Sequence, residues 1–388
     1  MDSLFEERAS ACALNRIFGY TPRVAAALIR ELGCASAAFS LSQEQLHKYF
    51  GARRDLRDKI VESALRQARE ELQRLEEEGC SYISLSEDCY PTLLKECDDA
   101  PAGLYVRSGT AAEKLFNRAE SISIVGTRDI SPYGKEWCER MVGAISESPS
   151  KPLIVSGLAF GVDITAHMAA LACGLSTIAV LPVGIDSVYP SSHRVAAGKI
   201  ASAPGSALVT DYPPGTAALG VNFLRRNRII AGLSRATILV ESRAKGGGTM
   251  TARLAAGYGR DVFALPGRIE DKRSEGCNIL LKEKIAEPII SLGCLGAELG
   301  LGEYRLRRAA DLSELVREHF SLRGDTDADA LAQMAALVKR RRGITLDELC
   351  EETSLSYSRV SSLALRLQSE GFIDIDLLQR CYATVRRG

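Results

Sequence analysis

Six short runs of apolar and β-branched residues alternate with helical stretches between residues 121 and 281. Each interval leaves room for one crossover helix, which is the pattern of repeated βα units. Such connections are almost always right-handed, and a parallel sheet is covered by helices on both faces. The sequence therefore predicts an α/β fold with a Rossmann-like, doubly wound, mostly parallel sheet. The runs begin near Ile122, Leu153, Thr177, Ala207, Ala236 and Asp261.

The segments on either side of the sheet have other patterns, so the 388-residue chain is expected to hold several domains. Apolar residues recur at helical spacing within residues 10–74, which predicts a small helical module. A glycine-rich stretch and a polar segment after the sheet indicate a linker. The last segment is typical of a winged helix, with residues 357–369 in the recognition-helix position. The predicted domains are a helical module at residues 1–78, an extension leading into the sheet at 79–120, the Rossmann-like domain at 121–292, a linker at 293–328 and the winged helix at 329–388.

Composition and charge exclude several classes of protein. The chain is 46% hydrophobic and 25% charged, and no apolar run approaches the roughly 18 residues that cross a bilayer. No secretory signal is visible in residues 1–8, and the eleven cysteines include no C-x-x-C pair. We therefore expect a cytoplasmic protein with reduced thiols and no membrane association. Because 49 basic and 49 acidic residues give no net charge, any site for a polyanion must be a local cluster.

Conspicuous loops follow all six predicted strands. In an open parallel sheet, ligands bind outside the carboxyl ends of the strands, where glycine lets backbone N–H groups approach phosphate oxygens. One glycine after a strand, such as Gly157 or Gly184, is common turn chemistry, but six converging loops favour a binding rim. The loops of this rim are Gly126-Thr127-Arg128, Ser156-Gly157, Pro182 to Asp186, Asp211 to Gly215, Glu241 to Gly248 and Pro266-Gly267-Arg268.

The densest cluster of positive charge lies at residues 223–228, directly before an apolar helical stretch at residues 229–233. Arginine suits bidentate phosphate recognition, and an aromatic ring offers a platform for a base. A basic run by itself is typical of a solvated surface. Its place beside the rim favours nucleic-acid binding. The cluster reads Phe223-Leu224-Arg225-Arg226-Asn227-Arg228.

Motifs of nucleotide-dependent enzymes are absent from the sequence. Gly134-Lys135 is followed by Glu136, so there is no G-x-x-x-x-G-K-[ST] loop, and no G-x-G-x-x-G follows a predicted strand. Asp163 and His167 share a helix face, but packing and helix capping explain this pair better than catalysis does. We therefore expect no catalytic residue, no metal and no cofactor.

Taken in order, the motifs of residues 121–281 resemble those of the DprA family, also called Smf or DNA-processing protein A. The resemblance implies a homodimeric protein without catalytic activity that binds and protects incoming single-stranded DNA in natural transformation and loads the recombinase RecA on it. It also implies a SAM-like or helix-hairpin-helix module for the N-terminal helices. The matching set is Gly126-Thr127-Arg128, Ser156-Gly157 with Gly161, Asp163 and His167, Gly184-x-Asp186-x-x-Tyr189-Pro190, Arg226-Asn227-Arg228-Ile229-Ile230-Ala231-Gly232, Gly247 with Thr251-Ala252, Pro266-Gly267 and Gly276-x-Asn278.

The resemblance also implies which residues hold the nucleic acid. The implied phosphate pocket consists of Arg128, Ser156, Gly157, Phe223, Arg226, Asn227, Arg228 and Gly247, to which we add Gly126 of the first rim loop. The family often has a lysine three residues before the phenylalanine, and this chain has Gly220 there. Arg225 and Arg243 are the cations that can substitute for that lysine, so both belong to the expected site.

Two alternatives stay open. Lonely Guy phosphoribohydrolases share a Rossmann-like fold and a glycine-rich loop similar to residues 245–249, but the position of their general acid/base glutamate is Ala252 here. A winged-helix regulator would instead bind duplex DNA through residues 357–369. That segment carries only Arg359 and Arg366 against Glu370, and the wing begins with Asp374 and Asp376, which is poor electrostatics for a duplex. We expect an accessory or protein-contact role for the C-terminal domain.

Overall fold

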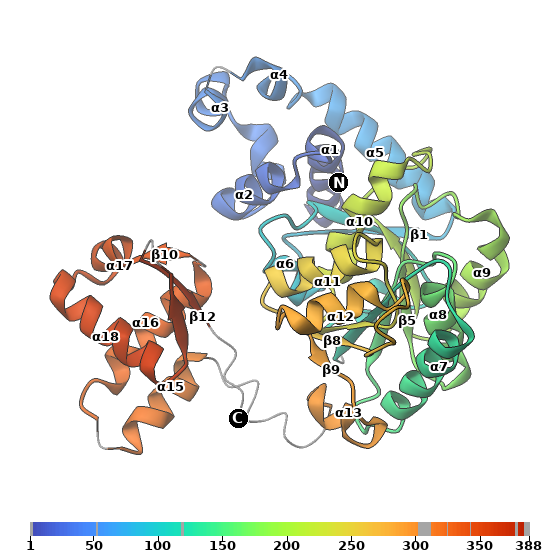
Figure 1. Cartoon of the computed structure of the whole chain (residues 1–388). Coiled ribbons are helices and arrows are strands. Elements are labelled where there is room, and N and C mark those ends of the chain that lie inside the picture. The colour runs from blue at the N-terminus through green and yellow to red at the C-terminus, as the bar shows by residue number, and fades with distance from the viewer. Residues whose placement is uncertain are drawn as a thin grey trace. The chain divides into compact units, whose positions relative to one another are not determined.

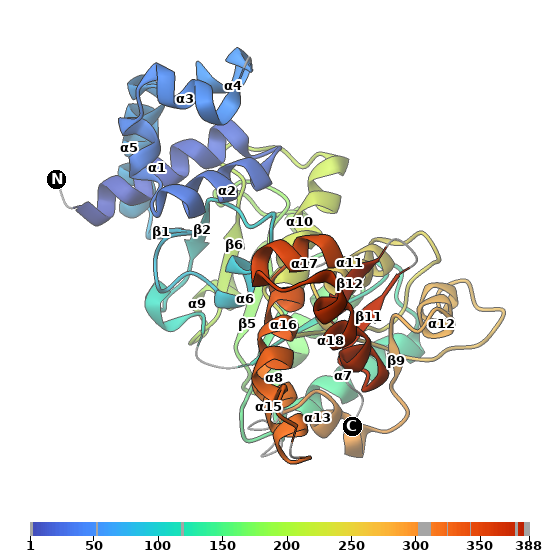
Figure 2. The same ribbon diagram turned by 90° about the vertical axis from the view of Figure 1, so that its left-hand side faces the viewer.

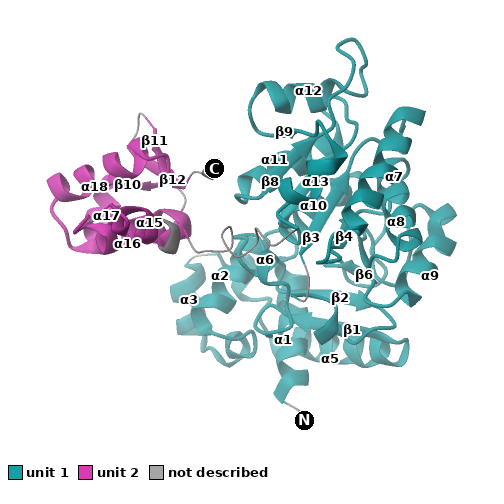
Figure 3. Cartoon of the chain, turned by 90° about the horizontal axis from the view of Figure 1, so that it is seen from below, with its two compact units in different colours: residues 1–302 teal, residues 303–388 magenta. Residues whose placement is uncertain are grey.

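The computed structural model of the chain describes residues 3–51, 53–117, 120–301, 312–323, 325–341, 343–376 and 379–383. The chain forms two compact units, residues 1–302 and residues 303–388, coloured teal and magenta in Figure 3. Each unit has its own hydrophobic core, so the two are described separately.

The first unit begins with five helices. They are α1 (Ser3–Phe18), α2 (Pro22–Leu32), α3 (Gln43–Phe50), α4 (Arg54–Arg57) and α5 (Glu62–Glu77), with the 3-10 turn η1 (Ser36–Ser40) between α2 and α3. The helices α1 and α5 pack on the strand β1 (Cys80–Ser84), and they lie beside it in both Figure 1 and Figure 2. Their buried side chains, including Leu14 and Leu72, join the same core as the sheet. The predicted boundary at residue 78 therefore does not separate two independent cores, because the apolar faces of these helices are buried against the sheet itself.

The sheet of the first unit has nine strands. Six of them, β3 to β8, are parallel and begin where the sequence predicts, which confirms the Rossmann-like fold class. The extension at residues 79–120 adds β1 and β2 (Gly103–Arg107), which pair antiparallel to each other, and β2 also pairs antiparallel to β6. The remaining strands are β3 (Ser121–Val125), β4 (Leu153–Ser156), β5 (Thr177–Val180), β6 (Ala207–Thr210), β7 (Ala236–Leu239), β8 (Asp261–Ala264) and β9 (Glu287–Pro288).

Helices cover both faces of this sheet. Successive residues of a strand point to opposite faces, so Ile124 and Val125 of β3 belong to two different cores. The helices α7 and α8 contribute to one core and α10 and α11 to the other, on opposite sides of the sheet in Figure 1. The helices of this domain are α7 (Pro132–Ser146), α8 (Val162–Ala172), α9 (Arg194–Ser202), α10 (Gly220–Gly232), α11 (Gly247–Gly257), α12 (Glu275–Lys282) and α13 (Leu292–Glu298), with short turns α6 (Thr92–Lys95), η2 (Ala112–Lys114) and η3 (Ser191–His193).

The order of the strands is β1-β2-β6-β5-β4-β3-β7-β8-β9. The chain moves from β3 in one direction to β6, and α10 then carries it back so that β7 pairs on the other side of β3. Because right-handed crossovers in opposite directions place their helices on opposite faces, the loops after β3 and β7 lead to opposite faces of the sheet, and the place between these two carboxyl ends is called the crevice here. This topological switch point is where an open α/β sheet binds its ligand.

The predicted linker at residues 293–328 is largely helical where the structure describes it. Leu295 and Leu299 are buried at α13, which packs on α7 in the first unit. The helix α15 (Leu312–Ser321) buries Val316 and Phe320 in the core of the second unit. The linker prediction is therefore wrong at both ends. The glycine and polar residues of this segment indicated a linker, so its two short amphipathic helices were not recognised from the sequence. Residues 302–311 lie outside the described part of the chain.

The second unit contains the elements predicted for its end. After α15 come α16 (Ala328–Arg340), β10 (Ile344–Thr345), α17 (Leu346–Thr353), α18 (Tyr357–Ser369), β11 (Ile373–Ile375) and β12 (Arg380–Ala383). The three strands form an antiparallel sheet in the order β10-β12-β11. Thr345 and Glu348 form a capping box that starts α17. This order of elements is the one expected of a winged helix, and that assignment stays a prediction.

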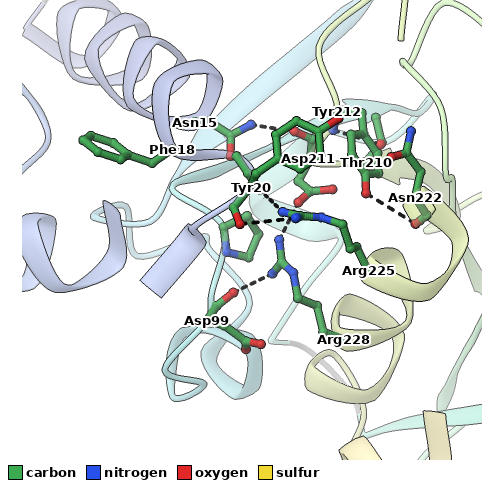
Figure 4. Close-up of polar contacts among 12 residues, drawn as sticks. Asn15, Phe18, Tyr20, Asp99, Thr210, Asp211, Tyr212, Asn222, Arg225 and Arg228 are labelled. Carbon is green, nitrogen blue, oxygen red and sulfur yellow. Dashed lines mark hydrogen bonds and ion pairs between the residues drawn. The ribbon is translucent and has the colours of Figure 1, made fainter. Parts of the chain in front are cut away.

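Two arginines of α10 bind other parts of the first unit (Figure 4). Arg225 donates to the carbonyl oxygens of Gly19 and Tyr20, and its guanidinium carbon lies 4.3 Å from the centre of the Tyr20 ring. Arg228 forms a buried ion pair with Asp211, with 2.5 Å between Nη2 and Oδ2. Burial alone would lower the pKa of Arg228, but the charge of Asp211 raises it above its ordinary value. Both guanidinium groups are therefore part of the scaffold.

Replacing Arg228 with methionine should lower the free energy of unfolding of the first unit by about 3–5 kcal/mol, because the Asp211 carboxylate would stay buried without its cation. Urea denaturation followed through Trp137, the single tryptophan, measures this change. The matched control is Arg253→Met on α11, since Arg253 pairs with Glu283 at an exposed site and should contribute less than about 1 kcal/mol. An equally small effect of both substitutions would contradict the assignment.

A buried histidine makes the stability of the first unit depend on pH. His167 of α8 is fully buried, and its Nδ1 lies 2.7 Å from Thr177 Oγ1. Burial, helped by the nearby charge of Arg226, lowers the pKa of His167 to about 3. The imidazole is therefore neutral in the folded chain, whereas in the unfolded chain it titrates near its ordinary value of about 6.5.

Between about pH 6.5 and the folded value, the unfolded chain binds a proton that the folded chain does not, so stability falls as pH falls. At about pH 5 the His167 contribution should cost about 2 kcal/mol relative to neutral pH. Urea denaturation of the wild type and of His167→Gln at several pH values checks this difference. Parallel pH profiles of the two proteins would show that His167 is not the titrating group.

Candidate nucleic-acid interface

The loop after β3 carries the exposed arginine that the sequence places on the rim. The backbone N–H of Thr127 donates to the carbonyl oxygen of Glu241 at 2.7 Å, which ties the ends of β3 and β7 together. Arg128 follows at the surface with an exposed side chain. Gly126 and Arg128 therefore lie at the switch point, on the β3 side of the crevice.

A buried carboxylate fixes this loop. Glu241 accepts hydrogen bonds from the backbone N–H of Ser131 at 2.9 Å and from its hydroxyl at 2.5 Å, at the start of α7. A negative charge at a helix N-terminus is favourable because the first N–H groups lack partners within the helix. The Glu241 carboxylate therefore occupies the N-terminus of α7, where an anion could otherwise bind, and it holds the loop that presents Arg128. From the sequence, Glu241 is expected only as the first residue of a glycine-rich loop, because its contact with Ser131 depends on which strand lies beside β7.

The opposite side of the crevice is the start of α11. Its N-terminal residue, Gly247, is exposed, and its carbonyl oxygen lies 3.5 Å from Asn227 Nδ2. Arg243 and Lys245 are exposed in the loop that leads from β7 to this helix. Unlike α7, this helix begins with glycine at the N-cap, Gly246, which has no side chain to cap it, and of the first helix amides the Ser242 hydroxyl accepts only the N–H of Thr249, at 3.2 Å. The first amides of α11 and two exposed cations thus form an electropositive edge.

The loop after β4 is fixed from below by a buried guanidinium. Arg226 is only 3% exposed and donates to the carbonyl oxygen of Gly157 at 2.6 Å and to that of Val180. A side chain at position 157 would collide with this guanidinium, so glycine is required there. Burial lowers the pKa of Arg226 to about 10, and the nearby Asp163 carboxylate partly offsets that effect. Ser156 directs its hydroxyl to the carbonyl oxygen of Ile124 at 2.7 Å, so it links β4 to β3.

The aromatic ring of the predicted site meets the exposed arginine. The guanidinium carbon of Arg128 lies 4.7 Å from the centre of the Phe223 ring, which is partly buried. The Phe223 ring also contacts Tyr189 edge to face, with ring centres 5.1 Å apart. Residues from the β3 loop, α10 and the segment before α9 thus converge at one place, as the rim hypothesis expects.

Two residues of the expected site lie elsewhere. The sequence predicts the arginines directly before an apolar helix, but α10 begins at Gly220, so they lie within the helix and point in different directions around its axis. Arg225 is directed to the turn after α1, and Arg228 is paired with Asp211 (Figure 4). The expectation that both guanidinium groups are open to phosphate does not agree with these internal partners. Arg226 contacts the rim loop after β4 through Gly157, whereas Arg228 contacts the rim loop after β6 only through its buried ion pair with Asp211.

The structure also bears on the two alternatives. Ala252 is fully buried on α11, so the position of the Lonely Guy glutamate offers no carboxylate to a ligand. In the second unit, Arg359 pairs with Asp327, and Arg366 pairs with Asp325 and Asp327. The two cations of the recognition-helix position are therefore neutralised within the unit.

Two further expectations, the absence of a metal site and of membrane association, can be compared with the described residues. Within the described residues, no three His, Cys, Asp or Glu side chains are grouped so that they could hold a metal ion. None of the described helices is long and apolar enough to span a membrane.

Sequence relatives give the family. The model of the family described as DNA recombination-mediator protein A matches residues 81–298. The DNA processing protein DprA of Streptococcus pneumoniae is 38% identical over 201 residues, which cover 52% of this chain and 68% of that protein. A putative DNA processing protein DprA of Mycobacterium tuberculosis is 30% identical over 376 residues, which cover 89% of this chain and 88% of that protein.

Solved structures agree with this result. The X-ray structure of DprA from Streptococcus pneumoniae matches with a TM-score of 0.56 and 32% identity, covering 66% of this chain and 87% of that chain. DNA processing protein A from Helicobacter pylori, whose structure concerns a single-stranded DNA binding mode, matches with a TM-score of 0.50 and 30% identity, covering 57% of this chain and 96% of that one. The chain therefore belongs to the DNA recombination-mediator protein A family, the DprA or Smf family that its motifs resemble.

Proposed function

We propose that the chain binds single-stranded DNA in the crevice between the ends of β3 and β7. One observation carries the proposal: the switch point brings Arg128, the Phe223 ring and the start of α11 to the same edge of the sheet. A cation, an aromatic platform and unpartnered helix amides are the elements that hold an unpaired polynucleotide. The relative from Helicobacter pylori, described for its single-stranded DNA binding mode, supports the same choice.

The phosphates are proposed to lie between Arg128 and the amides of Gly247 and Gly248, with Arg243 beside them. Arg128 and Arg243 are exposed, so they can change partners at little cost. Gly126, Ser156, Gly157, Arg226 and Asn227 are proposed to shape the crevice from below, because they are tied to neighbouring loops. Arg225 and Arg228 drop out of the proposed contact set, since each has protein partners.

The aromatic ring accounts for a preference for single strands. Phe223 lies between Arg128 and Tyr189, and its ring face becomes available to a base when Arg128 turns from the ring to a phosphate. In a duplex, base faces are stacked on one another and are not available to a protein ring, whereas in a single strand they are. Sequence preference is expected to be slight, because every base has such a face.

The wider role proposed here is that of the DprA type. In this role a cytoplasmic homodimer protects incoming single-stranded DNA in natural transformation and loads RecA on it, without catalysing a reaction. Membership of the DNA recombination-mediator protein A family supports this role. Accelerated assembly of RecA on oligothymidylate in the presence of the chain is the expected result, and the absence of any acceleration would remove this part of the proposal.

Arg128→Ala should weaken binding to oligothymidylate and make it less sensitive to salt. Each phosphate neutralised on a single strand contributes roughly −0.7 to the slope of log affinity against log salt, so the slope should fall by roughly 0.7 in magnitude. Fluorescence anisotropy over a salt series measures both quantities. Arg140→Ala is the matched control, because Arg140 is an exposed arginine of α7 that stacks on Trp137 and pairs with Glu136. If the two variants behaved alike, Arg128 would not be a DNA contact.

A chain ending at residue 302 should keep most of its affinity for single-stranded DNA. The first unit has its own cores, and the cations at the recognition-helix position of the second unit are already paired with Asp325 and Asp327. Anisotropy titrations of the full chain and the shortened chain, each with oligothymidylate and with a duplex, give the comparison. Loss of all DNA binding on truncation would favour the duplex regulator instead.

A further inference from the structure

We infer that Phe160 is a second base-stacking platform, so that the bound strand crosses Arg128 with one base on Phe223 and another on Phe160. This inference rests on the proposed function and adds a residue that none of the sequence motifs singled out. It concerns the loop between β4 and α8, where a large aromatic side chain is left 46% exposed.

The backbone places Phe160 next to the loop that carries Arg128. Gly161 has a φ of +73° and packs against the backbone of Thr127 and Arg128 so closely that a side chain would collide with it. The N–H of Val162 donates to the carbonyl oxygen of Thr127 at 3.1 Å. Phe160 therefore emerges on the same rim, beside the β3 side of the crevice.

The ring of Phe160 is supported along one edge. It contacts the imidazole of His193 edge to face, with ring centres 4.7 Å apart and planes at 68°. His193 is held in turn, since its Nδ1 lies 2.9 Å from the carbonyl oxygen of Leu158 in the same loop. A supported ring loses little conformational freedom when a base stacks on it, which favours binding.

One short segment supports both aromatic platforms. Tyr189 contacts the Phe223 ring edge to face at 5.1 Å, and His193, four residues later, contacts Phe160. Tyr189 is itself 40% exposed. Residues 189–193 thus set the spacing of two edge-to-face pairs, and the guanidinium of Arg128 lies against one of them. Two aromatic rings on the rim that also presents Arg128 match the alternation of bases and phosphates along a single strand.

The alternative explanation is structural: Phe160 only packs His193 against the loop between β4 and α8. That role needs apolar volume and not a π face, so leucine would satisfy it. A stacking role needs the ring. Comparing leucine with tryptophan at position 160 therefore separates packing from base recognition.

Binding of oligothymidylate to Phe160→Leu and Phe160→Trp should differ. Loss of one stacked base corresponds to about a fivefold or larger weakening of affinity, so Phe160→Leu should bind at least that much more weakly. Its salt slope should stay unchanged, because stacking neutralises no phosphate. Phe160→Trp should bind as the wild type does. With an oligonucleotide that lacks its bases, wild type and Phe160→Leu should bind equally, because no base is left to stack.

Fluorescence gives an independent measurement in the full-length chain. In the double variant Trp137→Phe, Phe160→Trp, the single tryptophan reports on position 160, and oligothymidylate should quench it. The reference is Trp137→Phe, Tyr49→Trp, which places a tryptophan on α3 among the N-terminal helices at a partly exposed position and should show no quenching.

The outcomes separate the inference from the proposed function. If Phe160→Leu binds as the wild type does and the tryptophan at position 160 is not quenched, while Arg128→Ala is weakened, the second platform is refuted and the proposed function stands. If Arg128→Ala is also unaffected, the crevice is not the DNA site, and both fail. A weakened Phe160→Leu with an altered thermal unfolding curve and no rescue by tryptophan would assign Phe160 to packing, and that result also overturns the inference.

Discussion

The reversal of strand order between β3 and β7 is the constraint on which the rest of the first unit depends. It forces α10 to return across the sheet, and this return brings Phe223 over the β3 loop and Arg226 under the β4 loop. It also leaves the start of α11 open at the same edge. In a sheet whose strand order did not reverse, all crossovers would run in the same direction, and no such crevice would form. The topology thus assembles the proposed site before any ligand arrives.

The two helix N-termini at this crevice differ in whether a buried charge of the protein occupies them. Glu241 satisfies the start of α7 from within the protein, whereas the start of α11 has glycine at its cap and exposed cations nearby. The same division applies to the arginines. Arg226 and Arg228 are buried and hold the scaffold, and Arg128 is exposed and available to an anion. A chain with no net charge can therefore present a local polyanion site, because its internal charges are matched where they are buried.

Much of the fold could be predicted, because a parallel strand buried on both faces is a continuous apolar run that stands out from its neighbours. The strands β1 and β2 were not predicted, because Ser81 and Ser84 interrupt the apolar run of β1 and both strands pair antiparallel, outside the repeated βα pattern. The site was predicted in part. Spacing placed Arg128, Gly157 and Gly247 on the rim, but the directions of Arg225 and Arg228 depend on where α10 begins, and no capping signal marks Gly220. Phe160 was missed because its value as a platform comes from His193, which is distant along the chain.

Hydrogen–deuterium exchange of the full chain, with and without saturating oligothymidylate, tests most directly whether the switch-point crevice holds the strand. Exchange reports on each backbone amide, so it distinguishes a phosphate bound at the α11 N-terminus from general stabilisation. The account predicts slowed exchange at residues 126–128 and 246–248, and little change at residues 357–369. Protection confined to residues 357–369, with the amides of Gly247 and Gly248 unaffected, would contradict it.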